Sequence, residues 1–365
     1  MTGDHLLQDR AAVAVLVHRI ADAAARLGRP ATLMEVCGTH THAVAAAGLR
    51  RMLPEGIRLV SGPGCPVCVT PVGYLDRALA LAARPGTVLC TFGDLMRVPS
   101  STVSLEQARA AGRDIRIVYS PRDALAIAQE TGLQLVFLAV GFETTTPTIA
   151  AALAEAEATA TPNFQILPGN KLIPPAIAAL VSDPDLEVHG FLLPGHVSVL
   201  TGWRAFEFLA DEHGVPGAVV GFAPTDILRG VLELVEQNGG GRSEIVNLYS
   251  TVVSPSGNRT AAALVERFFA PADDSWRGFG VIPRSGLALR PEWAHRDASR
   301  IPVELPPPQE PAGCRCGEVL RGVIDPPACP LFDEGCTPST PVGACMVSSE
   351  GTCSAWFRND RWGAT

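Results

Sequence analysis

Cysteines are the residues of this sequence best suited to chemistry, and six of the ten lie between positions 314 and 353. Four thiolates carried on bendable loops suit a [4Fe–4S] cluster, and four thiolates also suit zinc. The spacing matches neither the C-x2-C-x2-C run of a bacterial ferredoxin nor the paired knuckles of a zinc ribbon, so it does not select the ligands. Because six thiols in forty residues is too dense for inert buried cysteines, we expect a metal centre and favour iron–sulfur. The six are Cys314, Cys316, Cys329, Cys336, Cys345 and Cys353.

A second candidate site is the stretch MEVCGTHTHA, in which Cys37 ends a predicted strand and a helix follows. A thiol at a helix N-terminus is expected to have a lowered pKa, which favours the thiolate. His40 follows three residues later and could share a metal or take a proton. The alternative is a buried structural cysteine followed by a capping threonine.

A third candidate is SGPGCPVCVTP, where Cys65 and Cys68 form a C-x-x-C pair. That spacing supports a reversible disulfide or half of a zinc site. The surrounding glycines and prolines stiffen the turn and let the backbone approach a ligand closely. A non-catalytic reading also stays open, in which Cys37, His40 and this pair hold one zinc ion in an adaptor protein.

Three weaker loops carry polar residues at predicted strand ends, the edge where α/β sheets bind ligands. They are GFETTTP with Glu143, PGHVS with His196, and TFGDLMRVPS with Asp94 and Arg97. Each could equally be a helix cap. Neither a GxGxxG fingerprint nor a GxxxxGK[ST] loop is present, so nucleotide binding has no support in the sequence.

The elements that must position these residues follow one repeating pattern from residue 31 to about 253: an apolar strand, a small-residue turn, then a helix. This pattern predicts parallel α/β sheets. The expected strands are Ala31–Val36, Arg58–Ser61, Thr87–Phe92, Asp114–Tyr119, Leu133–Val140, Asn163–Leu167, Val188–Leu193, Ala218–Gly221 and Ile245–Tyr249. Expected helices between them include Leu75–Ala83, Pro121–Glu130 and Pro147–Ala158.

Nine strands fit two sheets better than one, and we place the boundary near Gly141. The predicted fold is α/β, with two parallel-sheet Rossmann-like domains and a cysteine-rich C-terminal iron–sulfur region. The expected divisions are an N-terminal helix over 1–30, α/β domains over 31–140 and 141–290, and the cysteine-rich region over 291–365.

The amino-acid composition limits the types of protein to which this chain can belong. Hydrophobic residues at 47% and charged residues at 18% can bury a core, and the net charge of −8 disfavours nucleic acid or an anionic membrane as the main partner. The apolar run Ala11–Val17 is flanked by charges, so it predicts an amphipathic helix and not a signal peptide. No run reaches the length of a membrane span. We therefore expect a cytoplasmic protein whose thiols stay reduced.

Taken in order, MEVCGTHTHA, SGPGCPVC, GFETTTP, PGHVS and the CRCGEVLRG…CPLF…CTPSTPVGACMVSSEGTC tail resemble the HypD family of [NiFe]-hydrogenase maturation factors, over nearly the whole chain. The resemblance implies two α/β domains and a third region that holds a [4Fe–4S] cluster. It also implies a scaffold on which the Fe(CN)2CO unit of the hydrogenase is built. The implied partners are a HypC-type chaperone and a HypE-type donor of cyanide from a thiocyanate.

The resemblance further implies roles for single residues. Cys37 looks like the thiolate that binds the cargo iron, with His40 beside it, and Cys65 and Cys68 look like a redox pair. Glu143 and His196, in matching motifs, are taken as further catalytic residues. The expected cluster ligands are Cys316, Cys329, Cys336 and one of Cys345 and Cys353, with Cys314 as the surplus thiol.

This set of parts predicts a redox-active assembly scaffold and not a simple turnover enzyme. Releasing cyanide from a thiocyanate takes two electrons, which a dithiol can deliver together and a single cluster only one at a time. The order we expect is cluster, then C-x-x-C pair, then ligand transfer at Cys37. The main alternative is an iron–sulfur thiol–disulfide reductase, in which Cys37 is incidental.

Overall fold

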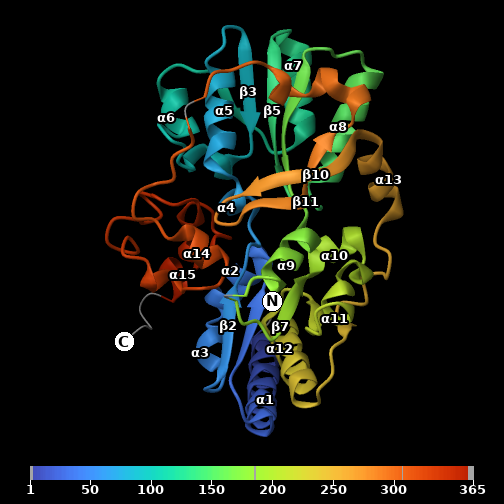
Figure 1. The fold of residues 1–365 in the computed structure, drawn as a ribbon, viewed down its shortest axis with the longest axis vertical. Coiled ribbons are helices and arrows are strands. Elements are labelled where there is room, and N and C mark those ends of the chain that lie inside the picture. Colours follow the sequence, from blue (N-terminus) through green and yellow to red (C-terminus); the bar gives the residue numbers. More distant parts are fainter. Residues whose placement is uncertain (1–2, 185, 306, 361–365) are drawn as a thin grey trace.

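Two parallel sheets form separate lobes, one above the other in Figure 1. The computed structural model describes residues 3–184, 186–305 and 307–360. The lower sheet has five strands in the order β2-β1-β7-β8-β9, and the upper has four in the order β4-β3-β5-β6. Their bounds are β1 Ala31–Glu35, β2 Ile57–Ser61, β3 Thr87–Thr91, β4 Ile115–Ile117, β5 Gln134–Gly141, β6 Phe164–Asn170, β7 Gly190–Pro194, β8 Gly217–Val220 and β9 Ile245–Asn247.

Helices cover both sheets, as expected for parallel strands that need crossover connections. Their bounds are α1 Gly3–Leu27, α2 Gly38–Ala46, α3 Leu49–Met52, α4 Pro66–Val69, α5 Val72–Ala82, α6 Leu105–Ala110, α7 Pro121–Thr131, α8 Thr146–Ala158, α9 Ile173–Val181, α10 Gly195–Thr201, α11 Phe208–Asp211, α12 Pro224–Gly239, α13 Arg259–Phe268, α14 Cys316–Leu320 and α15 Thr352–Asn359.

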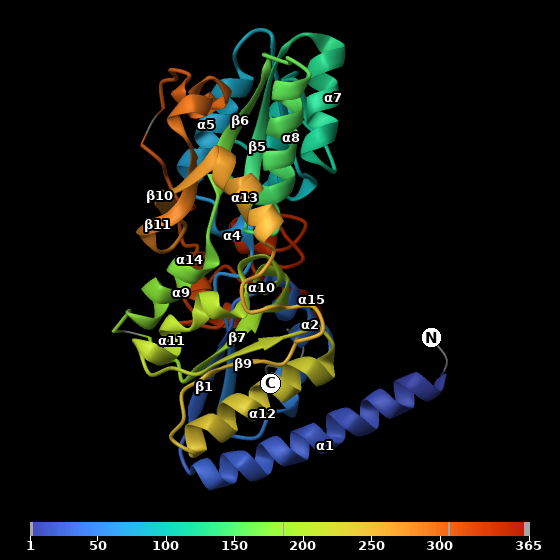
Figure 2. The same ribbon diagram turned by 90° about the vertical axis from the view of Figure 1, so that its right-hand side faces the viewer.

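All nine predicted strands are confirmed, within a few residues at each end. The sequence made them visible because strands buried on both faces are nearly continuous apolar runs. The clearest example is β5, with the sequence QLVFLAVG, in which every residue after Gln134 is buried. The amphipathic helix is confirmed as α1, which buries Leu16, Ile20 and Ala23 and lies alongside α12 (Figure 2).

The order of strands in the sheets differs from the order along the chain. The chain forms β1 and β2 of the lower sheet, leaves to build the whole upper sheet, and returns at β7, which pairs with β1. The boundary expected near Gly141 falls inside the upper sheet, because β5 before it pairs with β6 after it. Residues 31–61 and 190–247 therefore share one sheet, which no local pattern indicated.

A β-hairpin was not predicted. Strands β10 (Phe269–Trp276) and β11 (Gly280–Leu289) pair antiparallel and lie across the region between the lobes (Figure 1). Strand β10 could not be predicted from its sequence, FAPADDSW, because proline and two aspartates are unusual in strands. Within the described part of the chain, no helix is both long and apolar enough to cross a membrane.

Candidate functional site

Four loops that carry candidate residues meet at one edge of the five-stranded sheet. Strands β2, β1, β7 and β8 are consecutive neighbours and run parallel, so their carboxyl ends lie side by side. Cys37 follows β1, Cys65 follows β2, His196 follows β7 and Phe222 follows β8. The interleaved topology thus unites motifs that the expected domain division had separated.

The two cysteine loops touch through Gly64. The backbone N–H of Gly38 donates to the carbonyl of Gly64 at 2.8 Å. A Cβ atom added to Gly64 would lie 2.3 Å from the nitrogen of Cys37 and 2.5 Å from its Cα. Only glycine allows this approach, and it places Cys65, the next residue, against the Cys37 loop.

Replacing Gly64 by alanine is expected to force these loops apart, because the obstructing atoms are backbone and cannot rotate away. We expect a loss of about 2 kcal/mol or more in the free energy of unfolding, measured by denaturant titration. Gly73 is the matched control: its added Cβ would meet Pro308 at 3.7 Å, an ordinary contact. Equal stabilities of the Gly64→Ala and Gly73→Ala variants would contradict the packing described here.

The pKa of the Cys37 thiol differs from the expectation. Burial raises it to about 12, the nearby charge of Glu35 adds to the rise, and the amides of His40 and Thr39 oppose it. The prediction of a lowered pKa at a helix N-terminus was therefore wrong, since desolvation outweighs the helix contribution. A metal ion bound at the sulfur replaces this proton, because a coordinating thiol is deprotonated outright.

Glu35 contacts the backbone of Cys37 and is fully buried. Its carboxylate accepts from the Cys37 backbone N–H at 3.2 Å and from the Thr41 hydroxyl at 2.6 Å. Burial raises its pKa to about 7, against the opposing effects of these donors and of Arg50. The carboxylate fixes the turn that presents the thiol, although the sequence analysis did not select it.

His40 keeps one ring nitrogen free. Its Nε2 lies 3.0 Å from the carbonyl of Gly221, which assigns the proton to Nε2 and leaves Nδ1 as an acceptor. Nδ1 is buried and has no hydrogen-bond partner among the described residues. Burial lowers the pKa of His40 to about 4, so the ring is neutral at pH 7. A neutral imidazole with a free lone pair can bind a metal or accept a proton.

His196 joins this group through an aromatic bridge. Its ring stacks on Phe222 at 3.9 Å, and Phe222 lies 4.9 Å from His40. Desolvation lowers the pKa of His196, although it is more exposed than His40. The structure therefore brings His196 near Cys37 and His40, although the expected domain division had placed His196 in a second domain.

The C-x-x-C pair reaches the cysteine-rich tail. Cys65 and Cys68 are 3% and 0% exposed, and the Cys68 N–H donates to the Cys65 sulfur at 3.3 Å. Burial raises the pKa of Cys68, and the thiols of Cys345 and Cys65 raise it further. Cys345 in turn interacts with Cys316 and Cys353. The Cys68 thiol thus interacts both with its partner in the pair and with Cys345 of the tail.

The tail cysteines have the donor chemistry that an iron–sulfur cluster needs. All six are free thiols, and five of them are buried. Beside them lies the buried guanidinium of Arg277, whose charge acts on Cys314 and Cys316 and whose Nη2 has no partner among the described residues. A cation held against soft thiolates suits an anionic cluster. In the described ranges, no three side chains of His, Cys, Asp or Glu are already arranged around one metal position.

Glu350 is a second site residue, after Glu35, that the sequence analysis missed. The Oε1 atom of Glu350 accepts a hydrogen bond from the Thr39 hydroxyl at 2.9 Å. A Cβ atom added to Gly38 would lie 2.6 Å from the Cβ atom of Glu350. The tail is anchored to the upper lobe as well, because Ser348 donates to Asp94 at 2.8 Å and Arg97 donates to a tail carbonyl. Three residues before Cys353, Glu350 carried no signal beyond its place in the tail.

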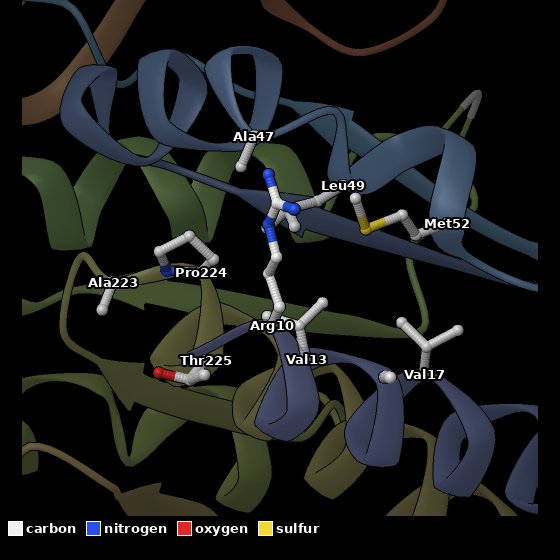
Figure 3. A pocket seen from close by; sticks show the side chains of 10 residues that line it. Arg10, Val13, Val17, Ala47, Leu49, Met52, Ala223, Pro224 and Thr225 are labelled. Carbon is white, nitrogen blue, oxygen red and sulfur yellow. The ribbon is translucent and has the colours of Figure 1, made fainter. Parts of the chain in front are cut away.

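Glu143 lies in a different environment from the cysteines. It follows β5 of the upper sheet and lines a cavity whose described lining includes none of the predicted cysteines or histidines. A groove of about 910 Å³ between α1, the α2–α3 region and the start of α12 likewise has no predicted cysteine or histidine in its described lining (Figure 3). Its walls are mostly apolar, with Arg10 extending across it from α1, and it holds no candidate catalytic side chain.

Comparison with known proteins identifies relatives of this chain. Residues 11–360 match the family model described as "HypD: Hydrogenase formation hypA family". The chain is 46% identical over 339 residues to "Hydrogenase maturation factor HypD" of Rhizobium leguminosarum bv. viciae, covering 90% of this chain and 88% of the relative. It is 45% identical to the protein of that name from Escherichia coli (strain K12), over 90% and 89% of the two chains. The Rhodobacter capsulatus protein is 42% identical over 96% of each chain.

Proposed function

The chain belongs to the HypD family of hydrogenase maturation factors, and we propose that it is the scaffold on which the Fe(CN)2CO unit of a [NiFe]-hydrogenase is assembled. The observation that carries this proposal is the set of interacting thiols that joins Cys345 of the tail to the C-x-x-C pair, together with the close approach of Gly64 to the Cys37 loop. In this proposal the assembly site and the electron store are adjacent.

Cys37 holds the iron as cargo in this proposal. Cyanide and carbon monoxide favour low-spin Fe(II), for which a thiolate is a suitable protein anchor. The free Nδ1 of His40 supplies a neutral acceptor nearby, either for the metal or for a proton released during ligand transfer. Glu350 and His196 complete the polar surroundings, since Glu350 acts electrostatically on Cys37 and His196 acts on His40.

The pair Cys65 and Cys68 supplies the two electrons that free cyanide. An organic thiocyanate R–S–CN and the two thiols become R–SH, hydrogen cyanide and the Cys65–Cys68 disulfide. The S–CN bond breaks and the S–S bond forms, so the dithiol is oxidised while the thiocyanate is reduced. Hydrogen cyanide then gives up its proton as cyanide binds the iron, and we assign the neutral His40 as the acceptor of that proton.

Returning the disulfide to the dithiol needs an electron source in the tail. A [4Fe–4S] cluster supplies single electrons when it is bound. We assign its ligands to Cys316, Cys329, Cys336 and one of Cys345 and Cys353. The buried Arg277 contributes a positive charge at this place and joins it to the C-x-x-C turn, because its Nε donates to the carbonyl of Thr70 at 2.9 Å.

Two partners are part of the proposal. A HypC-type chaperone provides a second ligand to the cargo iron, and a HypE-type protein delivers the thiocyanate. Both must reach Cys37, which is 9% exposed. The groove of Figure 3 borders this region at Ala223, the residue after Phe222.

A thiol–disulfide reductase is the alternative function, and the burial of the pair weighs against it. A reductase attacks a protein disulfide with an accessible thiolate. Both thiols of the pair are almost fully buried, and burial raises the pKa of Cys68 well above that of an ordinary thiol. Electron storage beside an internal site suits these thiols better than exchange with a large substrate.

Infrared spectroscopy of the protein purified with its chaperone and cyanide-donor partners tests the proposal. We expect stretching bands of iron-bound cyanide and carbon monoxide, and the cyanide bands should shift when the thiocyanate carbon is ¹³C. Turnover of a small disulfide that is unaffected by Cys37→Ala, in a sample without such bands, would favour the reductase instead.

A further inference from the structure

A cavity of about 260 Å³ lies where the start of α8, the end of α10, helix α13 and the β10–β11 hairpin meet. Its walls are mainly apolar, with Leu172, Val265 and Phe269 among them. It lies between the two lobes, where ligand sites are common in proteins of this architecture.

Glu143 is among the residues that line this cavity, and one of its two carboxylate oxygens has no hydrogen-bond partner among the described residues. The side chain is 9% exposed, and its Oε1 accepts from the backbone N–H of Ile173 at 2.8 Å. Its Oε2 is buried and has no partner among the described residues. Burial raises the pKa of Glu143 to about 7. An unpaired buried acceptor is costly, so its retention in the wall of a cavity points to a ligand that pairs with it.

The charged side chains in the described lining of the cavity are both carboxyl groups. Glu266 is the second carboxyl group in the lining, and the described lining residues include no lysine, arginine or histidine. The hydroxyls of Thr146 and Thr201 already donate to the carbonyls of Phe142 and Val197, so only their oxygen lone pairs remain. These walls fit a ligand that donates hydrogen bonds and is positively charged.

We propose that this cavity binds a primary alkylammonium group, with Oε2 of Glu143 as its ion-pair partner and the apolar walls around its carbon chain. A guanidinium fits less well, because it pairs best with both oxygens of a carboxylate and Oε1 is already engaged by Ile173. The group belongs either to a free amine or to a lysine side chain of a bound protein. The proposal does not depend on cyanide chemistry.

Isothermal calorimetry on the full-length protein tests this site with n-butylammonium as the probe and n-butanol as its uncharged counterpart. We expect saturable binding of n-butylammonium, weakened at least about tenfold by Glu143→Gln. Glu106→Gln removes a carboxylate from α6, outside this lining, and is expected to leave binding unchanged. Equal binding of n-butanol, equal binding by the Glu143→Gln variant, or no saturable binding by the wild type would overturn the proposal.

A second variant keeps the test decisive if the Glu143→Gln variant does not fold. Ala261→Leu adds bulk to the cavity wall from α13 without changing charge, and it too should abolish binding. Binding retained in that variant contradicts the location. The source of the ligand follows from a parallel titration with Nα-acetyllysine amide: tighter binding than n-butylammonium assigns the cavity to a protein side chain, and weaker binding assigns it to a free amine.

Discussion

Replacing Cys68 by serine is expected to stop cyanide from reaching the iron, while the tail keeps its iron–sulfur absorption. Serine cannot form the disulfide that releases two electrons, so the S–CN bond stays intact. The tail thiols, including Cys345, are unchanged in the variant. Infrared spectra should therefore lack cyanide bands, while visible absorption and iron analysis still report a cluster. Cys65→Ser is expected to give the same result, since the pair acts as one unit.

A stability effect must be separated from this redox effect. A hydroxyl at the fully buried Cys68 position costs about 1–3 kcal/mol if it finds no partner. Cys90 is the matched control, because it is also 0% exposed and lies in β3 of the upper sheet. Cys90→Ser carries a similar cost but should keep the cyanide bands. Full cyanide bands in the Cys68 variant would refute the proposed order of electron transfer.

The sequence predicts most of the strands and helices of this fold. Nine strands were predictable because each is an apolar run that is bounded by turn residues. Cys37, Cys65 and His196 were each predicted to lie at the carboxyl end of a strand, where parallel sheets place their chemistry, but His196 was assigned to a second domain. The sequence did not show which strands are neighbours in each sheet, and the order of the strands decides which carboxyl ends lie side by side.

Long-range features account for what the sequence did not predict. The pairing of β1 with β7 joins segments more than 150 residues apart, and nothing in either segment encodes its partner. The contact of Glu350 with Thr39 spans a separation of 311 residues. The pKa of Cys37 was misjudged for the same reason, since its sign depends on burial by the surrounding chain and not on the helix that follows.

Replacing Cys37 by serine is expected to have a different and larger effect, the loss of the cargo iron itself. A serine hydroxyl is a poor ligand for low-spin iron. Cys37 is the only cysteine before Cys65 in the sequence, so its own motif offers no second thiol that could bind the iron instead. Both the cyanide and the carbon monoxide bands should disappear from the infrared spectrum. The cluster absorption should remain, because the tail thiols and the C-x-x-C pair are untouched.

The contrast between the two variants identifies the role of each thiol. If Cys37 anchors the iron and Cys68 stores electrons, the Cys68 variant retains cargo iron that lacks cyanide, and the Cys37 variant retains neither. Iron analysis with the cluster contribution subtracted distinguishes the two cases. Loss of cargo iron from both variants would instead make the C-x-x-C pair part of the iron site. That outcome would replace the electron store by a shared thiolate site, with Gly64 holding its two loops together.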